Sequence, residues 1–286
     1  MGRTILLADS GATKTTWALL TGKKITHWHT QGISPYLMDV EKIEAIIRSE
    51  LPASLTKKTI QAIYFYGTGC KATSKARMVK SALQHIYPDA EVHVTHDLMA
   101  SAVALCGTDS GIACILGTGS GSCYYNGKRI VGQSPGLGYV LGDEGSGAYF
   151  GKILVRNFLY ASFDEDLHRA FSSAYRLDRD SILQSVYREP LANRFLAGLS
   201  PFLSKHRGHY MIENIIEDGL REFFELHLKP YSRIHEMPVH FVGGIAWSFR
   251  DILRELCSEY GYTMGTVMKQ PIEGLIKHHL RASHGK

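Results

Sequence analysis

Apolar and polar positions along the first thirty residues follow the pattern of a strand meander. Thr4–Ala8, Thr15–Leu20 and Ile25–Thr30 are runs of apolar and β-branched residues, and short segments of turn-forming residues separate them. Such runs, bounded by Gly, Ser and Asp, are typical of strands. The sequence therefore predicts three consecutive strands with turns at Asp9–Lys14 and Thr21–Lys23.

Strands and helices alternate over the rest of the first hundred residues. After Asp39 and again after Thr73, apolar residues recur at helical spacing, and each of these two polar residues is placed to cap a helix. The expected elements are a helix after Asp39, a strand at Ile60–Tyr66, a helix after Thr73, a strand at Glu91–Thr95 and a helix at Leu98–Cys106. The predicted order is βββαβαβα.

The second part of the chain repeats this order, with a long helical region after the third strand, from about 146 to 229. Its expected elements are strands at Gly111–Leu116, Ser122–Tyr125 and Lys128–Val131, then a strand at Pro238–Val242, a helix at Trp247–Tyr260, a strand at Tyr262–Met268 and a helix from Pro271. Two copies of one topology predict a duplicated α/β fold with a cleft between the halves. We expect domains at 1–107 and 108–270, with the C-terminal helix 271–286 joining the first.

Composition narrows the function classes. The chain of 286 residues is 44% hydrophobic and 21% charged, which is typical of a globular protein with a sizeable core. No apolar run approaches the ~18 residues of a spanning helix, and the N-terminus resembles a strand more than a signal peptide. The net charge of +5 comes from scattered residues. We therefore expect neither a nucleic acid nor a membrane as partner.

Two counts refine this picture. The five cysteines are odd in number and contain no CxxC, which favours a reducing compartment and a cytoplasmic location over a disulfide framework. Glycine is over-represented, with 28 residues where average usage would give about 20. The glycines gather in segments that follow predicted strands.

The first of these segments is Asp9–Lys14, which reads Asp-Ser-Gly-Ala-Thr-Lys. Gly11 lets a phosphate approach the backbone, Thr13 adds a hydroxyl, and Lys14 adds a positive charge. Asp9 supplies a carboxylate for Mg²⁺, directly or through water. The same residues also suit an ordinary hairpin turn. A P-loop is excluded, because the GxxxxGK[ST] pattern is absent and a strand follows.

Two more glycine segments occupy comparable places. Gly117, Thr118, Gly119 and Ser120 follow the first strand of the second half, where they could cradle a phosphate opposite the first segment. Gly243 and Gly244 stand between an apolar strand and a helix, where a flat ring could approach the backbone. Each alone could also be a plain turn or a helix start.

Taken in order, these three segments resemble the motifs of the sugar kinase/Hsp70/actin ATPase superfamily. Asp9–Lys14 is similar to its first phosphate loop, Leu116–Ser120 to its second, and Val242–Ala246 to its adenosine loop. The resemblance covers almost the whole chain. It implies two duplicated RNase H-like domains around an ATP cleft, with ATP and Mg²⁺ as cofactors.

A further segment narrows the resemblance. Gly136–Gly147 closely resembles the GxGxxxGDEGS segment of N-acetylglucosamine kinases in the BadF/BadG/BcrA/BcrD ATPase family. The resemblance implies an amino sugar substrate, most readily N-acetylglucosamine. It also implies sugar contacts by Gly136, Leu137, Gly138, Asp143 and Ser34. Two of these positions depart from the animal enzymes, which have Trp in place of Leu137 and an Asn in the stretch that contains Ser34.

Asp97 is the expected catalytic base. It stands at a strand-to-helix junction, and the family's aspartate at this place accepts the proton of the attacking sugar hydroxyl. Phosphoryl transfer needs mainly positioning and charge stabilisation, so one carboxylate, Mg²⁺ and backbone donors suffice. A plain helix N-cap is the alternative for Asp97.

Two other functions compete with a sugar kinase. The first is an ATPase that activates a partner enzyme, as the 2-hydroxyacyl-CoA dehydratase activators of the same broad family do, with cysteines that share an iron–sulfur cluster across a dimer. The second is a catalytically dead sugar-binding regulator, which the presence of Asp9, Thr13 and Asp97 disfavours. The expected partner is a small-molecule sugar, and a homodimer is a further expectation.

Overall fold

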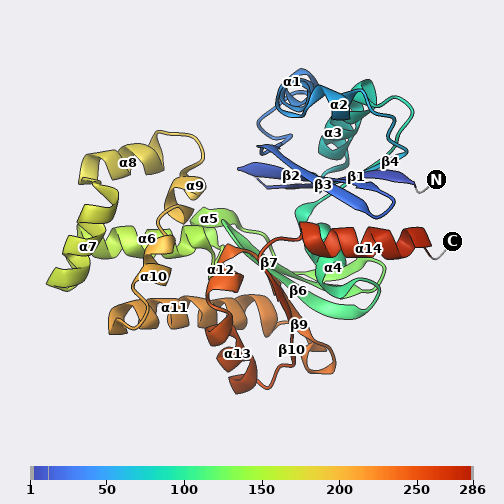
Figure 1. Cartoon of the computed structure of the whole chain (residues 1–286). Helices are drawn as coiled ribbons and strands as arrows, with labels where there is room; N and C mark the ends of the chain where they lie inside the picture. Colours follow the sequence, from blue (N-terminus) through green and yellow to red (C-terminus); the bar gives the residue numbers. More distant parts are fainter. Residues whose placement is uncertain (1–2, 12, 285–286) are drawn as a thin grey trace. The chain divides into compact units, whose positions relative to one another are not determined.

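The fold consists of two compact units of similar construction. The computed structural model describes residues 3–11 and 13–284, without the side chains of 282–284. The first unit comprises residues 1–109, 127–129 and 270–286, and the second comprises 110–126 and 130–269. Each is built on one five-stranded sheet (Figure 1).

The two sheets have the same topology. In the first, the strands are β1 (Thr4–Ser10), β2 (Lys14–Thr21), β3 (Lys24–Gln31), β4 (Ala62–Gly67) and β5 (Glu91–Thr95). In the second, they are β6 (Ser110–Leu116), β7 (Ser120–Asn126), β8 (Ile130–Gln133), β9 (Val239–Val242) and β10 (Met264–Met268). The orders β3-β2-β1-β4-β5 and β8-β7-β6-β9-β10 correspond strand by strand. The first three strands of each sheet are antiparallel and the last two run parallel to the first, so the expected duplicated RNase H-like fold is confirmed.

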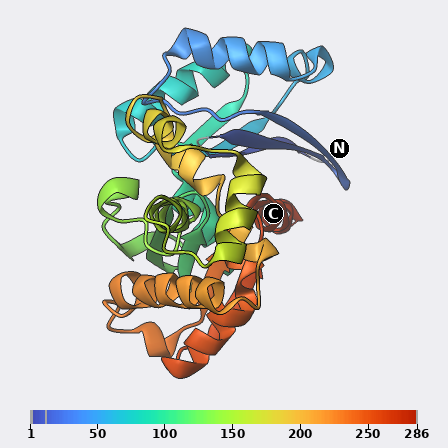
Figure 2. The same ribbon diagram turned by 90° about the vertical axis from the view of Figure 1, so that its left-hand side faces the viewer.

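Helices cover both faces of the first sheet (Figures 1 and 2). They are α1 (Val40–Glu50), α2 (Ala53–Thr56), α3 (Thr73–Ile86), α4 (Asp97–Cys106) and α14 (Ile272–His284). Ile43 and Ile47 of α1 and Leu83 of α3 pack with Leu6 and Phe65 of the sheet in one buried core. The apolar spacing that predicted α1 and α3 is therefore the spacing of residues that face this sheet.

The second unit carries the long helical region. Its helices are α5 (Gly138–Leu141), α6 (Gly147–Leu159), α7 (Glu165–Tyr175), α8 (Arg179–Tyr187), α9 (Ala192–Ala197), α10 (Pro201–Lys205), α11 (Tyr210–Phe223), the π-helix η1 (Phe224–Leu228), the 3₁₀ helix η2 (Ile234–Glu236), α12 (Gly244–Ser248) and α13 (Arg250–Glu259). Phe150 of α6, Phe223 of α11 and Phe241 of β9 are fully buried in its core. Among the described residues, no helix is both long and apolar enough to cross a membrane.

One predicted detail of the helices is confirmed and two differ. Asp39 caps α1 as expected, by accepting a hydrogen bond from the backbone N–H of Lys42 at 2.9 Å. Thr73 was wrong as a cap, because it is the first residue of α3 and the cap position is Ala72, whose methyl group cannot accept. The single helix expected at Trp247–Tyr260 is two helices that meet at Phe249, and the first begins at Gly244.

We predict that Gly274→Ala destabilises the first unit. A Cβ at Gly274 in α14 would lie 2.4 Å from the backbone carbonyl oxygen of Ala104 in α4, so the two helices would have to separate. The free energy of unfolding should fall by about 1–3 kcal/mol, as measured by chemical denaturation. Lys277→Ala, at an exposed position of the same helix, is the control and should change it by less than about 0.5 kcal/mol. Equal effects of the two substitutions would contradict the close helix contact.

Candidate active site

The first glycine segment is the turn between β1 and β2. The backbone N–H of Gly11 donates to the carbonyl of Lys14 at 3.0 Å, and the next residue, 12, lies outside the described residues. Gly11, Thr13 and Lys14 are all exposed, so their polar groups are accessible to a ligand. The geometry is a tight hairpin turn, and it leaves open the phosphate role that the sequence predicts.

Ser10 organises this turn, a role that the sequence analysis missed. Its Oγ, fully buried, lies 2.7 Å from Oγ1 of Thr15 and accepts a hydrogen bond from the backbone N–H of Ile33 at 3.0 Å. The backbone N–H of Gly32 donates to the carbonyl of Thr13 at 3.0 Å. The hairpin is thereby joined to the buried segment that contains Ser34, so two of the predicted sites share one hydrogen-bonded frame.

Asp97 begins α4, directly after β5. Its Oδ2 accepts a hydrogen bond from Oγ1 of Thr68 at 2.8 Å, and its Oδ1 accepts one from the backbone N–H of Leu98 at 2.9 Å. The N-cap position of α4 is His96, so the alternative of a plain N-cap for Asp97 is wrong. Two donors fix the orientation of the carboxylate at the start of the helix, where the macrodipole favours negative charge.

Thr68 is a second residue that the sequence analysis missed. Its backbone N–H donates to the carbonyl of Ser10 at 2.9 Å, which ties the segment after β4 to the end of β1. The sequence did contain a pattern that could have identified Thr68, because Gly67-Thr68-Gly69 repeats the Gly-Thr-Gly of the second glycine segment.

Electrostatic coupling connects Asp9 to Asp97. Burial, and to a smaller extent the negative charge of Asp97, raise the pKa of Asp9 to about 7, while the positive charge of Lys14 opposes the shift. Two carboxylates of which one is desolvated form a site that a divalent cation would stabilise. Asp9 therefore fits the Mg²⁺ role proposed from the sequence. Among the described residues, no group of three or more His, Cys, Asp or Glu side chains is arranged to hold a metal on its own.

The second and third glycine segments meet in the second unit. Gly243 has φ 131°, and a Cβ there would lie 2.1 Å from the carbonyl oxygen of Leu116, so only glycine fits. The backbone N–H of Gly117 donates to the carbonyl of Gly119 at 3.0 Å, which closes the turn between β6 and β7. At Gly244, by contrast, a Cβ would meet nothing within 4 Å. The Gly243–Gly244 segment and the start of the β6–β7 turn are therefore in direct contact, with open space beside Gly244.

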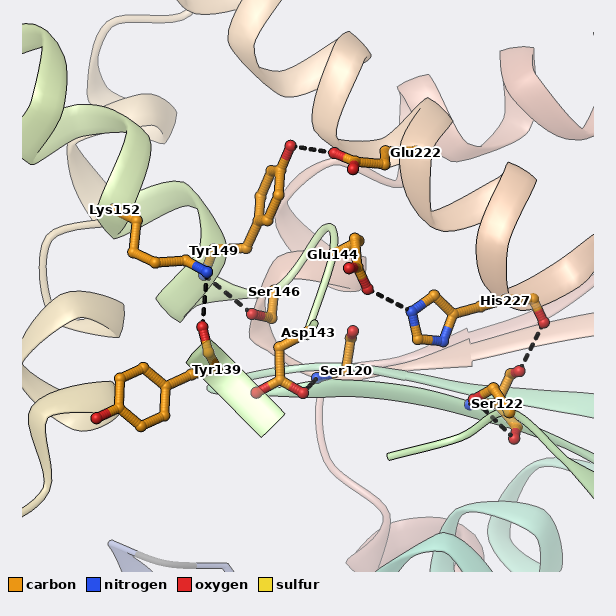
Figure 3. Close-up of polar contacts among 11 residues, drawn as sticks. Ser120, Ser122, Tyr139, Asp143, Glu144, Ser146, Tyr149, Lys152, Glu222 and His227 are labelled. Atoms are coloured by element: carbon orange, nitrogen blue, oxygen red, sulfur yellow. Dashed lines mark hydrogen bonds and ion pairs between the residues drawn. The ribbon is translucent and has the colours of Figure 1, made fainter. Parts of the chain in front are cut away.

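Asp143 lies against the Gly117–Ser120 turn (Figure 3). Its Oδ1 accepts a hydrogen bond from the backbone N–H of Ser120 at 3.3 Å, and a Cβ at Gly119 would come within 2.9 Å of its Oδ2. Burial raises the pKa of Asp143, and the Ser120 hydrogen bond opposes the shift. Oγ of Ser120 is buried and has no hydrogen-bond partner among the described residues. The structure thus brings together Gly119, Ser120 and Asp143, which were predicted for different ligands.

The rest of the predicted sugar segment is exposed. Gly136, Leu137 and Gly138 lie on the surface of the second unit, and Leu137 is 56% exposed. Gly138 begins the single helical turn α5, and Nζ of Lys152 in α6 donates to the carbonyl of Tyr139 at 2.6 Å (Figure 3). These residues are accessible to a ligand, as their predicted role requires.

Comparisons with known proteins find similar solved structures. The chain is similar to a provisionally assigned N-acetylglucosamine kinase of Porphyromonas gingivalis, with 39% identity over 97% of this chain and 99% of that one and a TM-score of 0.92. A provisionally assigned N-acetylglucosamine kinase of Chromobacterium violaceum matches with 18% identity over 96% and 98% and a TM-score of 0.74. A ROK family glucokinase of Streptomyces griseus, in complex with glucose and AMPPNP, matches with 15% identity over 98% and 97% and a TM-score of 0.55. No family model and no curated protein matches.

We predict that Asp9→Asn stabilises the protein at neutral pH. An aspartate in an unfolded chain loses its proton near pH 4, whereas Asp9 keeps it to about pH 7 in the folded state. Between these values the folded state holds a proton that the unfolded chain has lost, so the free energy of unfolding of the wild type falls as pH rises. The variant has no carboxyl group at this position and so lacks this loss. Its free energy of unfolding should exceed that of the wild type by an amount that increases as pH rises from 4 to 7.5 and reaches about 2–4 kcal/mol.

Denaturation at several pH values measures this effect. The control is Asp178→Asn. Hydrogen bonds from Ser181 lower the pKa of Asp178, so the pH dependence of stability that this carboxyl contributes is opposite to that of Asp9. The free energy of unfolding of Asp178→Asn should not increase relative to the wild type as pH rises. A parallel pH dependence for Asp9→Asn and the wild type would show that Asp9 ionises normally.

Proposed function

The chain belongs to the N-acetylglucosamine kinase-like branch of the BadF/BadG/BcrA/BcrD ATPase family, and on that premise we propose that it phosphorylates an amino sugar, most readily N-acetylglucosamine. It is an ATP-dependent carbohydrate kinase with an actin-like ATPase fold. The finer assignment, to an amino sugar, draws support from the provisional name of the 39% identical relative and from the Gly136–Gly147 segment.

The observation that carries the proposal is the fixed carboxylate of Asp97. Thr68 and the backbone N–H of Leu98 each donate to one of its oxygens, so its orientation is set before a substrate binds. In the proposed reaction, Asp97 accepts the proton of the sugar hydroxyl as that hydroxyl attacks the γ-phosphorus. The bond from the γ-phosphorus to the β–γ bridging oxygen breaks, and ADP leaves. A positioned base of this kind contributes about 10²–10⁴ to a rate.

ATP recognition is proposed for the glycine segments. Exposed Gly11, Thr13 and Lys14 offer a hydroxyl and a cation to phosphate oxygens. In the Gly117–Ser120 turn, Thr118 and Gly119 offer backbone N–H groups, and Ser120 offers a hydroxyl that has no hydrogen-bond partner within the described part of the chain. Gly243 and Gly244 are proposed for the adenosine. Mg²⁺ would be held through Asp9, directly or through water, and would neutralise charge on the transferred phosphoryl group. The Streptomyces griseus glucokinase of similar fold is described with AMPPNP, in keeping with this use of the fold.

The sugar is proposed to contact Asp143, Ser34 and the backbone of Gly136–Gly138. A carboxylate such as Asp143 accepts hydrogen bonds from sugar hydroxyls. Asp143 is partly buried, and this burial raises its pKa. The Ser34 and Leu137 positions are where this chain departs from the animal enzymes. They are therefore where we expect its choice among sugars to be set.

Cysteine burial weighs against the rival function. An activator of 2-hydroxyacyl-CoA dehydratases would present cysteines to a cluster shared by two subunits. All five cysteines here are buried, and burial raises the pKa of Cys70, Cys106 and Cys257 to about 12, which disfavours the thiolate that binds iron. A homodimer and a cytoplasmic location stay predictions.

We predict that Asp97→Asn abolishes phosphoryl transfer but not ATP binding. The amide cannot accept the sugar proton, so kcat should fall by about 10³, measured by sugar-dependent ATP consumption. The Kd for ATP, measured by calorimetry, should change less than about threefold. As a matched control, Thr68→Val keeps the carboxylate and removes one of its two donors, so kcat should fall only about tenfold. Near-normal turnover in Asp97→Asn would remove Asp97 from the mechanism.

A further inference from the structure

Glu144, beside the proposed sugar ligand Asp143, has a partner far away in the sequence. Its Oε2 lies 2.8 Å from Nε2 of His227, and the two side chains are only 13% and 7% exposed (Figure 3). The proposed function assigns no role to either residue. A buried pair of this kind is costly to desolvate, so it needs a structural or functional reason.

His227 is held rigidly on the single turn of π-helix η1. Its ring stacks on Phe223, with centroids 4.7 Å apart and planes at 14°. Its backbone carbonyl accepts a hydrogen bond from Oγ of Ser122 at 2.8 Å, and that Oγ lies 3.0 Å from the hydroxyl of Tyr231. A π-turn inside helical structure often marks a functional site. Here it keeps the imidazole directed at Glu144.

The free nitrogen of His227 identifies the donor in this pair. Nδ1 is buried and has no hydrogen-bond partner among the described residues. A hydrogen on Nδ1 would be an unsatisfied buried donor, so the hydrogen belongs on Nε2, which donates to the Glu144 carboxylate. His227 therefore acts as a fixed N–H donor.

The backbone on both sides of Glu144 has an unfavourable conformation that contacts with neighbouring residues must stabilise. Asp143 has φ 59° and Gly145 has φ 69°, so left-handed residues flank Glu144 on both sides. Left-handed backbone costs about 1–2 kcal/mol for a residue with a Cβ and persists only where its surroundings enforce it. Gly145 is packed so closely that a Cβ would lie 3.1 Å from Cβ of Phe223. The turn is thus held against the helix that leads into His227.

We propose that Glu144 and His227 are a positioning pair, which locks the turn that presents Asp143 and so sets affinity for the sugar. The identity of the ligand as a sugar rests on the proposed function. The effect of the pair on the conformation of the turn does not depend on that function. Asp143 would contact the sugar in both the ground state and the transition state, so a loosened turn raises KM for the sugar and leaves kcat little changed. Within the β6–β7 turn, the hydrogen bond from the backbone N–H of Gly117 to the carbonyl of Gly119 does not involve the turn at Glu144. KM for ATP should therefore change less than KM for the sugar.

The test compares His227→Met with His227→Gln. Met fills the space without a donor, whereas the Gln side-chain amide can place an N–H where Nε2 of His227 stands. His227→Met should raise KM for N-acetylglucosamine about tenfold, the equivalent of roughly 1.4 kcal/mol. His227→Gln should return it to within about threefold of the wild type. His209→Gln is the matched control, because His209 forms a pair of the same 2.8 Å length with Asp164 in the same unit.

Backbone hydrogen exchange of the protein without ligands provides the second readout. Peptides covering residues 142–148 should exchange faster in His227→Met than in the wild type, His227→Gln or His209→Gln. A sugar KM that rises equally in all three variants, or no faster exchange in His227→Met, would overturn the proposal. If the wild type phosphorylates no sugar, the proposed function fails, and the exchange rates alone decide whether the pair locks the turn.

Discussion

Parallel pairing of β1, β4 and β5 is the constraint on which the first half of the site depends. Register places Asp9 of β1 beside Tyr66 of β4, near the ends of both strands, and Asp97 follows the end of β5. Because parallel strands end at one edge, the charge of Asp97 lies close enough to raise the pKa of Asp9. Thr68 then links β1 to Asp97 through one backbone and one side-chain hydrogen bond. The chemistry assigned to Asp9 and Asp97 is a consequence of this pairing.

In the second unit, which has the same strand topology, the segments at the strand ends pack closely against one another. There the segment after β9 approaches the end of β6 so closely that Gly243 has no room for a Cβ, and the turn at Asp143 packs on the β6–β7 turn. Glycines divide accordingly into two classes. At Gly145 and Gly243 the protein itself fills the space, whereas at Gly136 and Gly244 the space is open. The open positions are the ones at which a ligand could approach the backbone.

The order of elements, the duplication and the glycine segments were predictable, because they rest on local periodicity and on residues adjacent in the chain. The cap at Asp39 was correct for the same reason, whereas Thr73 showed that a polar residue near a helix start need not be the cap. The pairing of Glu144 with His227 could not be predicted from the sequence. It joins residues 83 positions apart and depends on a π-turn that has no period of its own in the sequence. The site residues remain predictions from pattern, supported by where the fold places them.

The central claim is that the γ-phosphoryl group of ATP passes to a sugar hydroxyl. Incubation of the protein with ATP labelled at the γ-phosphate, Mg²⁺ and N-acetylglucosamine tests it directly, with product separation and mass spectrometry as the measurement. The account predicts that the label appears in an N-acetylglucosamine phosphate, and that little inorganic phosphate forms when the sugar is omitted. Label released only as inorganic phosphate, at the same rate with and without any sugar, would contradict it.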